Sequence, residues 1–237
     1  MCHEMVHRRS ALGTPDQGGG AQRRAGGKRS PGWLDAACVG AGAVRIGVER
    51  MAKLTYLTNM SLDGYIEDRH GAFDFGPMDD DLFVTYTDLL RTVGTFLYGR
   101  RLYETMAGWE TMPALAAQSS LTADFSNAWK APRKIVYSTT LATAPTTNTR
   151  IERAFDAAAV QQLKADASRD LTVGGANLAS QALNAGLVDE CILFVWPTSV
   201  GDGRPALPTD ARHSLELLDE RRFANGVLLL RYRPRPQ

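Results

Sequence analysis

After Met51, segments with strand character alternate with segments of helical period along the rest of the chain. Predicted strands cover residues 53–60, 95–98, 134–137, 149–153, 171–173 and 188–196, and predicted helices cover residues 79–92, 100–106, 121–130, 156–166 and 176–185. Strands that are separated by helical crossovers pair in parallel. Two final β runs, residues 213–223 and 227–232, flank Ala224-Asn225-Gly226, which is a hairpin turn signal. This order predicts one α/β domain whose largely parallel sheet ends in an antiparallel hairpin.

The first 50 residues differ in kind from the remainder. They hold 10 of the 22 glycines, 8 of the 27 basic residues and 4 of the 26 acidic residues, with no sustained helical or strand period. Such a composition predicts disorder. Residues 39–44 begin like a dinucleotide fingerprint, but Arg45 stands where a third glycine is needed. We therefore expect residues 1–50 to be a disordered extension or an over-long reading frame, and residues 51–237 to form the domain.

Apolar content and cysteine usage limit the class of protein. Of the 237 residues, 44% are apolar, which is enough for a substantial core. The apolar runs, such as residues 192–196, are far shorter than the roughly 20 residues of a spanning helix, and residues 1–13 lack the apolar stretch of a secretory signal. Cys2, Cys38 and Cys191 form no C-x-x-C pair, so we expect no disulfide framework. A cytoplasmic protein without a membrane partner is predicted.

Metal and nucleic-acid partners are not expected either. No H-x-x-x-H pair and no G-x-S-x-G elbow is present, and the histidines are scattered at His3, His7, His70 and His213. The net charge of the chain is +1, and the basic first 50 residues contain only one aromatic residue to stack on a base. The expected binding partner is therefore a small molecule.

The strongest chemical signal is a strand that runs through two glycines directly into a helix, in the segment Leu171-Thr172-Val173-Gly174-Gly175-Ala176-Asn177-Leu178. Unblocked backbone N–H groups at such a helix N-terminus attract an anion, and the two glycines allow a phosphate to approach closely. Ligands of open α/β sheets bind beyond the carboxyl ends of the strands. The alternative is a tight turn in which the glycines serve backbone geometry alone.

Two further strand ends have residues that suit an anion. Gly99 is followed by Arg100 and Arg101 at the start of a predicted helix, and guanidinium groups match phosphate geometry, including that of a nucleotide 2′-phosphate. Ser138 follows another predicted strand and adds a hydroxyl, although serine there is also a common turn residue. Three such strand ends predict an extended phosphorylated ligand such as a dinucleotide.

Two carboxylates are the candidates for acid–base chemistry. Asp63 lies in the turn Ser61-Leu62-Asp63-Gly64-Tyr65 after the first predicted strand, where it alternatively initiates the turn through its side chain. Asp81 lies in the first turn of a predicted helix, where it alternatively stabilises the positive end of the helix dipole.

The motifs occur in an order that identifies a family. Residues 51–233 resemble the dihydrofolate reductase-like superfamily, and most closely the reductase domain at the C-terminus of the bacterial riboflavin-pathway deaminase-reductase and its stand-alone relatives. The matching segments are Asn59-Met60-Ser61-Leu62-Asp63-Gly64-Tyr65-Ile66, Leu97-Tyr98-Gly99-Arg100-Arg101-Leu102-Tyr103-Glu104, Lys134-Ile135-Val136-Tyr137-Ser138, Val173-Gly174-Gly175-Ala176-Asn177-Leu178, Ala185-Gly186-Leu187-Val188-Asp189-Glu190 and Val200-Gly201-Asp202-Gly203-Arg204-Pro205.

The resemblance implies a dihydrofolate reductase-like fold and an NADPH-dependent reductase that works as a homodimer. It places Gly99, Arg100, Arg101 and Ser138 near the adenosine phosphate. It places the pyrophosphate on the segment between strand and helix that is formed by Gly174, Gly175, Ala176, Asn177 and Leu178.

Two departures from the family leave the substrate open. The segment 73–78 lacks the Leu-Pro-Trp that precedes the acidic helix of dihydrofolate reductases, and residues 1–50 contain no zinc deaminase motif. We expect a small heterocyclic or ribosylaminouracil-like substrate. Dihydrofolate reductase activity and a non-catalytic nucleotide- or flavin-binding domain are the alternatives.

Overall fold

The structure is a computed structural model that describes residues 51–236, so the predicted extension over residues 1–50 lies outside the described residues. The strands are β1 (Leu54–Ser61), β2 (Tyr65–Asp68), β3 (Val93–Gly99), β4 (Arg133–Tyr137), β5 (Thr149–Glu152), β6 (Asp170–Gly174), β7 (Glu190–Trp196), β8 (Gly203–Pro205), β9 (Leu215–Arg222) and β10 (Leu228–Pro234). The helices are α2 (Asp80–Thr92), α3 (Arg100–Thr111), α4 (Pro113–Ala116), α5 (Ser120–Lys130), α6 (Ala157–Asp166) and α7 (Ala176–Asn184).

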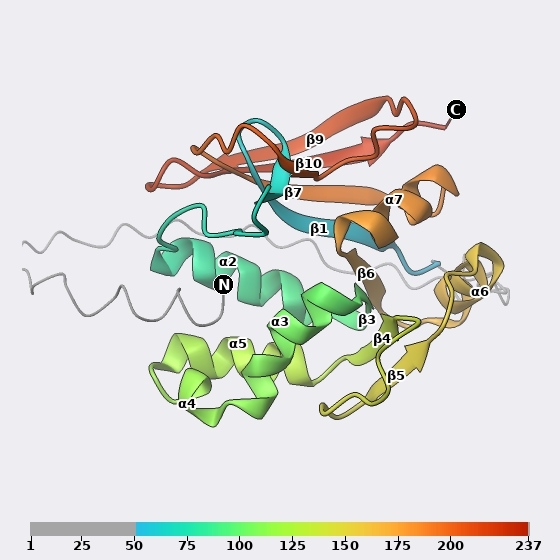
Figure 1. Ribbon diagram of the computed structural model, residues 1–237, viewed down its shortest axis with the longest axis horizontal. Helices are drawn as coiled ribbons and strands as arrows, with labels where there is room; N and C mark the ends of the chain where they lie inside the picture. The colour runs from blue at the N-terminus through green and yellow to red at the C-terminus, as the bar shows by residue number, and fades with distance from the viewer. Residues whose placement is uncertain (1–50, 237) are drawn as a thin grey trace, which may run out of the picture. The chain divides into compact units, whose positions relative to one another are not determined.

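One large sheet forms the centre of the described chain (Figure 1). Its strand order is β5-β4-β3-β6-β1-β7-β10-β9, and the pairs from β5 to β7 are parallel. The strand β10 pairs antiparallel with both β7 and β9. The turn between β9 and β10 uses Gly226 at φ 87°, a backbone conformation that glycine adopts without strain. The α/β fold with a mostly parallel sheet and a C-terminal antiparallel hairpin is confirmed.

Helices cover both faces of the sheet (Figure 1). The buried residues of α6 and α7 pack with one face, and those of α2, α3, α4 and α5 pack with the other. The strand β7 is buried at every position: Cys191, Leu193 and Val195 face one cluster, while Ile192 and Phe194 face another. Because both faces of β7 are buried, its sequence is largely an unbroken run of apolar residues.

The helix α2 shows how local sequence sets an element. Asp79 accepts a hydrogen bond from the Leu82 N–H at 2.8 Å, which satisfies one of the free donors at the helix start. Acidic residues follow in the first turn and Arg91 lies in the last, as the helix dipole favours. Leu82 and Leu90 are buried against the sheet. The helix then passes directly into β3 at Val93.

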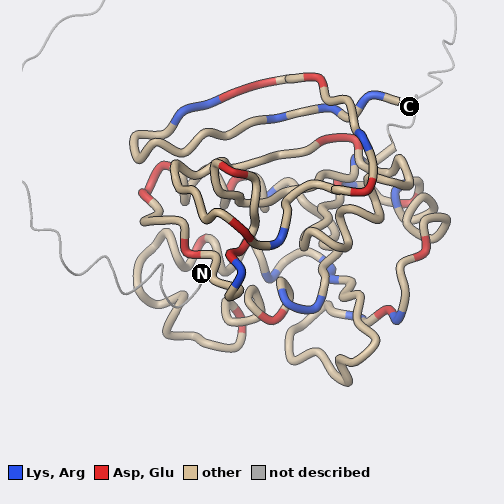
Figure 2. Tube along the Cα trace, turned by 45° about the horizontal axis from the view of Figure 1, so that its top comes forward, with Lys and Arg blue, Asp and Glu red and all other residues tan. Residues whose placement is uncertain are grey.

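A second, two-stranded sheet of β2 and β8 and the short helix α4 were not predicted. The strands β2 and β8 pair antiparallel although 140 positions separate Tyr65 from its partner Pro205, and such short segments show no apolar alternation that would predict the pairing. Acidic and basic segments are interspersed along the trace (Figure 2). Among the described residues, no helix has the length and apolar character needed to cross a membrane.

Candidate functional site

Four loops begin side by side at one edge of the sheet. In the strand register Tyr98 pairs with Gly174, Gly99 pairs with Tyr137, and Tyr137 pairs with Glu152. The carboxyl ends of β3, β4, β5 and β6 are therefore level with one another. This is the edge at which open α/β sheets bind ligands.

The junction of β6 and α7 approaches the junction of β3 and α3 closely. Gly175 has φ 91° and precedes α7, and a Cβ atom built on it would lie 3.7 Å from the Gly99 nitrogen. A Cβ atom on Gly174 would overlap the end of the Leu102 side chain and lie 3.2 Å from the Tyr98 ring. A Cβ atom on Gly174 therefore requires Leu102 to move, whereas at Gly175 the positive φ, and not a lack of space, favours glycine.

The two helices that begin at this edge differ in their caps from α2, α5 and α6. Side chains of Asp79, Ser119 and Asp156 cap α2, α5 and α6. The N-caps of α3 and α7 are Gly99 and Gly175, and neither helix has a side-chain cap. The first N–H groups of both helices are thus left for an anion or for solvent.

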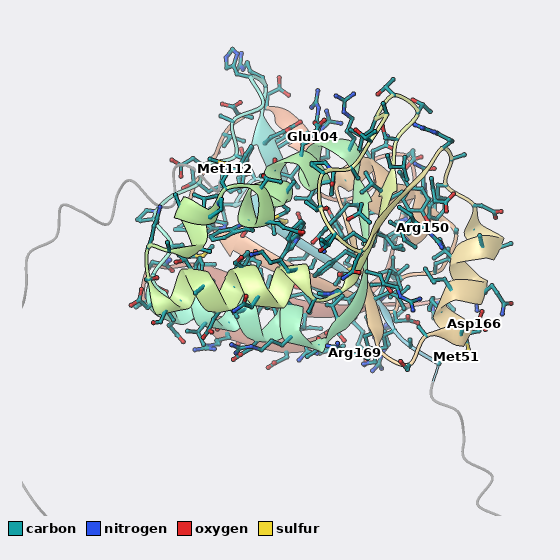
Figure 3. The ribbon with its side chains drawn as sticks, turned by 90° about the horizontal axis from the view of Figure 1, so that it is seen from below. Met51, Glu104, Met112, Arg150, Asp166 and Arg169 are labelled. Atoms are coloured by element: carbon teal, nitrogen blue, oxygen red, sulfur yellow. The ribbon has the colours of Figure 1, made fainter. Side chains whose placement is uncertain are left out.

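Arg100 and Arg101 extend from the first turn of α3. The Arg100 guanidinium donates to Glu104 at 2.7 Å and to the Thr140 hydroxyl at 2.8 Å; Glu104 is labelled on α3 in Figure 3. Arg101 is 74% exposed and donates to Glu67 of β2 at 3.2 Å. Both are surface-accessible cations that are held near the edge by single carboxylates.

Ser138 lies at the end of β4 and is nearly buried. Its hydroxyl oxygen accepts hydrogen bonds from the N–H groups of Thr140 at 3.2 Å and Leu141 at 3.0 Å, so it caps the turn that follows the strand. Arg153, one position beyond β5, donates to the carbonyls of Ser138 at 3.0 Å and Leu141 at 2.7 Å. Sequence reasoning missed Arg153, because the predicted strand extended to residue 153, whereas β5 ends at Glu152.

These loops border a cleft of about 1280 Å³. Most of the predicted cofactor residues line it, namely Gly99, Arg100, Arg101, Ser138, Gly175, Ala176, Asn177 and Leu178. Gly174 lies behind these residues, where it packs closely against Leu102 and Tyr98. The volume lies above the range of about 300–1,000 Å³ that is usual for the pocket of one small ligand, so the cleft has room for an extended ligand.

The two predicted catalytic carboxylates do not line the cleft. Asp63 is exposed and accepts hydrogen bonds from the Ser199 hydroxyl at 2.8 Å and from the N–H groups of Val200 at 3.1 Å and Gly201 at 2.7 Å. Hydrogen bonds, first from the side chain of Ser61 and then from these loop groups, hold the pKa of Asp63 well below its usual range. The geometry makes Asp63 an anchor for the loop after β7.

Asp81 is also engaged elsewhere. It is exposed on α2 and pairs with Arg221 of β9 at 2.6 Å. Its position fits an ion pair that links α2 to the C-terminal hairpin. A catalytic role for either carboxylate stays a prediction that the arrangement of the cleft does not favour.

A polar group that sequence reasoning did not single out lies inside the cleft on β1. The Asn59 side-chain oxygen accepts hydrogen bonds from the Tyr86 hydroxyl at 2.6 Å and from the Trp196 ring N–H at 2.8 Å. Burial raises the pKa of Tyr86 well above its usual value, so its hydroxyl stays protonated and donates. Asn59 stands in a quoted motif, but only the strand register shows that it faces α2.

Among residues 51–236, no group of histidine, cysteine and acidic side chains is arranged to hold a metal ion. The donors at the cleft are backbone N–H groups, arginines and hydroxyls. This chemistry suits phosphate oxygens and the polar edge of an organic ring.

Comparison with known proteins identifies the family. The sequence profile described as the RibD C-terminal domain matches residues 52–229. The chain belongs to this family. The chain is also similar to the uncharacterized protein YyaP of Bacillus subtilis (strain 168), with 29% identity over 185 residues, which cover 73% of this chain and 90% of YyaP.

Solved structures share the fold of this RibD C-terminal domain. A candidate riboflavin biosynthesis protein from Shewanella sp. PV-4 has a TM-score of 0.62 at 18% identity, and covers 78% of this chain and 100% of its own. A pyrimidine reductase-like protein of Corynebacterium diphtheriae has a TM-score of 0.53 at 14% identity, over 78% and 93% of the two chains. The diaminohydroxyphosphoribosylaminopyrimidine deaminase/5-amino-6-(5-phosphoribosylamino)uracil reductase of Thermotoga maritima has a TM-score of 0.50 at 13% identity, over 78% and 57%. The expected reductase-domain fold is thereby confirmed.

Proposed function

We propose that this protein is an NADPH-dependent oxidoreductase that reduces a small heterocyclic substrate of the ribosylaminouracil type. The observation that carries the proposal is the pair of uncapped helices, α3 and α7, which begin at the neighbouring residues Gly99 and Gly175. Two helix N-termini at adjacent strand ends form an anion site for an extended phosphorylated ligand. Membership of the RibD C-terminal domain family supports a reductase of the riboflavin-pathway kind.

The residues present fit NADPH. Gly175 with its positive φ and the close-packed Gly174 leave the backbone accessible where a pyrophosphate needs N–H donors. Arg100 and Arg101 supply guanidinium groups for the 2′-phosphate, which distinguishes NADPH from NADH. When bound, NADPH supplies a hydride for the carbon of a C=N or C=O bond, and a proton completes the reduction at the heteroatom, with NADP⁺ as the second product.

The protein contributes orientation and exclusion of water to this reaction. The stack of Tyr86 on Phe194, with 4.1 Å between ring centroids, and the bond from Tyr86 to Asn59 fix one wall of the cleft. Glu67 and Glu104 are the acids that line it, and each is paired with arginine. The lining carboxylates of the described chain are therefore paired, which leaves the His70 imidazole of the lining and solvent as sources of the proton.

The same observation favours one alternative, a domain that binds a nucleotide or flavin without turnover. A screen of NADPH oxidation at 340 nm, with the full chain and with dihydrofolate, 5-amino-6-(5-phosphoribosylamino)uracil, quinones and small carbonyls as acceptors, separates the two. We expect turnover of a heterocyclic acceptor. Turnover of dihydrofolate alone would assign dihydrofolate reductase activity instead, and binding of NADPH without oxidation by any acceptor would support the non-catalytic alternative.

A further inference from the structure

A carboxylate lies at the rim of the cleft, among groups that otherwise suit an anion. Glu67 of β2 lines the cleft together with Arg101 of α3 and Arg204 of β8. The Glu67 side chain is 16% exposed, whereas that of Arg101 is 74% exposed. A negative charge beside cations that attract a phosphate opposes the binding of that phosphate, so the position of Glu67 calls for an explanation.

An irregularity in β2 directs Glu67 to this side of the strand. The register of β2 and β8 shifts between Tyr65 and Glu67, as it does at a β-bulge. Successive side chains of a regular strand point to opposite faces, yet Ile66 and Glu67 both line the cleft. The backbone of β2 therefore places the carboxylate at the rim.

The neighbouring strand keeps the carboxylate in place. A Cβ atom on Gly203 would overlap the Glu67 carbonyl oxygen, so β8 passes this closely only because residue 203 is glycine. The next residue, Arg204, is opposite Glu67 in the register, and its Nε–H donates to Glu67 Oε1 at 2.6 Å. This charged hydrogen bond between facing residues of two strands fixes Glu67 from the side of β8.

Arg101 is held more loosely than Glu67. Its Nη1 group donates to the same Glu67 oxygen at 3.2 Å, and its guanidinium is largely exposed. Exposed ion pairs contribute little to stability, so Arg101 is able to turn towards a ligand while Glu67 stays in place. Arg101 and Arg204 each use a single nitrogen for Glu67, which leaves donors on both guanidinium groups for a phosphate.

A phosphate that binds to Arg101 or Arg204 shares a guanidinium with Glu67. It therefore lies within the screening length of the carboxylate, which is about 10 Å at about 0.1 M salt, and like charges repel at this range. This repulsion acts on the 2′-phosphate of NADPH, whereas NADH has a hydroxyl at the same position. A carboxylate is also a common acceptor for that hydroxyl in dinucleotide sites. The charge of Glu67 thus acts differently on the two cofactors.

We propose that Glu67 is a specificity-determining residue of the cofactor site, and that its fixed negative charge limits the preference for NADPH over NADH. The proposal rests on the proposed function, because it concerns the cofactor of the same cleft. Arg101 and Arg204 attract the 2′-phosphate, and Glu67 offsets part of this attraction. Arg204 joins Arg100 and Arg101 as a third arginine for the cofactor.

Glu67→Gln tests the proposal, because glutamine keeps the size and one accepting oxygen of glutamate but removes its charge. Nicotinamide fluorescence gives the dissociation constants of NADPH and NADH for the full chain. At about 0.1 M salt we expect Glu67→Gln to bind NADPH about fivefold more tightly than the parent chain, and to bind NADH equally or more weakly. NADPH binding that is unchanged or weaker in this variant would overturn the proposal.

Glu216→Gln is the matched control. Glu216 pairs with Arg233 at 3.7 Å on the C-terminal hairpin and lies outside the cleft lining. The control removes the same charge from the chain at a distance from the rim, so it should bind both cofactors as the parent chain does. A gain in NADPH affinity equal to that of Glu67→Gln would show that net charge, and not the position of Glu67, is responsible.

Ionic strength separates an effect of charge from an effect of structure. At about 1 M salt the screening length falls to about 3 Å, so the NADPH affinities of Glu67→Gln and the parent chain should agree within about twofold. A gain in affinity that persisted at this salt concentration would show that the substitution changes the shape of the rim, and it would overturn the proposal.

Arg204→Met should give the opposite result. Methionine keeps an apolar chain at this position but leaves Glu67 without the cation that faces it in the register. We expect NADPH to bind about fivefold more weakly and NADH to keep its affinity. An equal loss for both cofactors, or no loss for either, would remove Arg204 from the proposed site.

Adenosine 2′,5′-bisphosphate and adenosine 5′-phosphate keep this result separate from the proposed function, because they contain no nicotinamide. Their binding is measured by calorimetric titration of the same proteins. If NADPH does not bind but Glu67→Gln binds the bisphosphate more tightly than the parent chain does, the reductase assignment falls and the role of Glu67 stands. If the parent chain prefers NADPH over NADH and Glu67→Gln leaves this preference unchanged, the role of Glu67 falls and the proposed function stands. If none of these nucleotides binds, both fall.

Discussion

Some residues of this protein line the cleft, and others keep the segments around the cleft in place. Asp63 belongs to the second group by its contacts, since three groups of residues 199–201 donate to its carboxylate. Its lowered pKa stabilises the fold above the ordinary aspartate range, and this contribution is lost as pH falls through that range towards the folded-state pKa. Asparagine keeps the shape of aspartate but removes the charge and part of its accepting capacity.

We therefore expect Asp63→Asn to speed hydrogen exchange of the Val200 and Gly201 amides while NADPH oxidation continues at a similar rate. Hydrogen exchange followed by mass spectrometry, together with steady-state kinetics, checks both halves. Abolished turnover with unchanged exchange in this loop would instead assign Asp63 the catalytic role that its place in the sequence motif first suggested.

Cys191 gives a prediction on alkaline stability. Burial, and to a lesser extent the nearby Glu190 carboxylate, raise the pKa of the Cys191 thiol to about 12 from 9.0. The unfolded chain releases this proton at a lower pH than the folded chain does. The contribution of the Cys191 thiol to stability is therefore complete below pH 9 and is lost as pH rises from 9 towards 12. The slope for one such group is about 1.4 kcal/mol per pH unit.

Cys191→Ala should therefore show a free energy of unfolding that falls less steeply with pH by about this amount above pH 9. Urea unfolding at a series of pH values provides the measurement. The pKa values of the buried tyrosines are also raised by burial, so these tyrosines contribute the same slope of unfolding free energy against pH to both proteins. Identical slopes for the variant and the parent chain would show that Cys191 does not titrate in this way.

At the scale of elements, the junction between β6 and α7 is the most constrained part of the site. A Cβ atom on Gly174 meets Leu102 and the Tyr98 ring, whereas one on Gly99 has its nearest neighbour at 3.9 Å. We expect Gly174→Ala to destabilise the fold by about 1–3 kcal/mol, as overpacking of a core does, and to weaken NADPH by displacing the following helix. Gly99→Ala is the control for stability and should unfold as the parent chain does. Equal stability of the two variants would contradict the close packing described.

Sequence reasoning predicted the elements whose apolar residues follow a helical or strand pattern within the segment itself. Asp79 followed by apolar residues at helical spacing predicted α2, and the apolar run before Trp196 predicted β7. The pairing of β2 with β8 depends on contacts between distant segments, so no local pattern predicted it. The glycine and arginine positions of the cleft follow from strand ends, which the sequence locates. Asn59 was missed because only the register of the assembled sheet decides which face it lines.

On the scale of the whole molecule, the domain boundary at Met51 stays a prediction. The strand β1 begins at Leu54, and the cofactor residues proposed here all follow it. We expect a shortened chain that begins at Met51 to unfold at the same temperature as the full chain and to bind NADPH equally well. An affinity loss of more than about tenfold, or roughly 1.4 kcal/mol, would move the boundary into the preceding residues.

Association into a homodimer stays a prediction. The apolar run of β7 is buried on both faces within one chain, so it does not require a second copy. Leu217 and Leu218 on β9 and Leu228 on β10 are the exposed large apolar side chains of the hairpin at the edge of the sheet, and as neighbours in a strand Leu217 and Leu218 point to opposite faces. Light scattering of the same shortened chain reports its mass, and a monomeric mass at micromolar concentration would exclude the dimer under those conditions.

The central claim is that the edge formed by α3 and α7 binds the phosphates of NADPH, and a comparison of NADPH with NADH tests it most directly. Nicotinamide fluorescence is titrated with the parent chain, with the double variant Arg100→Ala and Arg101→Ala, and with Arg150→Ala as a control. Arg150 is an exposed arginine that pairs with Glu152 outside the cleft lining and is labelled in Figure 3. We predict that the parent chain and the control bind NADPH at least about tenfold more tightly than NADH, and that the double variant loses this preference while still binding both. No binding of NADPH by the parent chain up to about 1 mM, which corresponds to about −4.1 kcal/mol, or an equal loss for both cofactors in the double variant, would contradict the account.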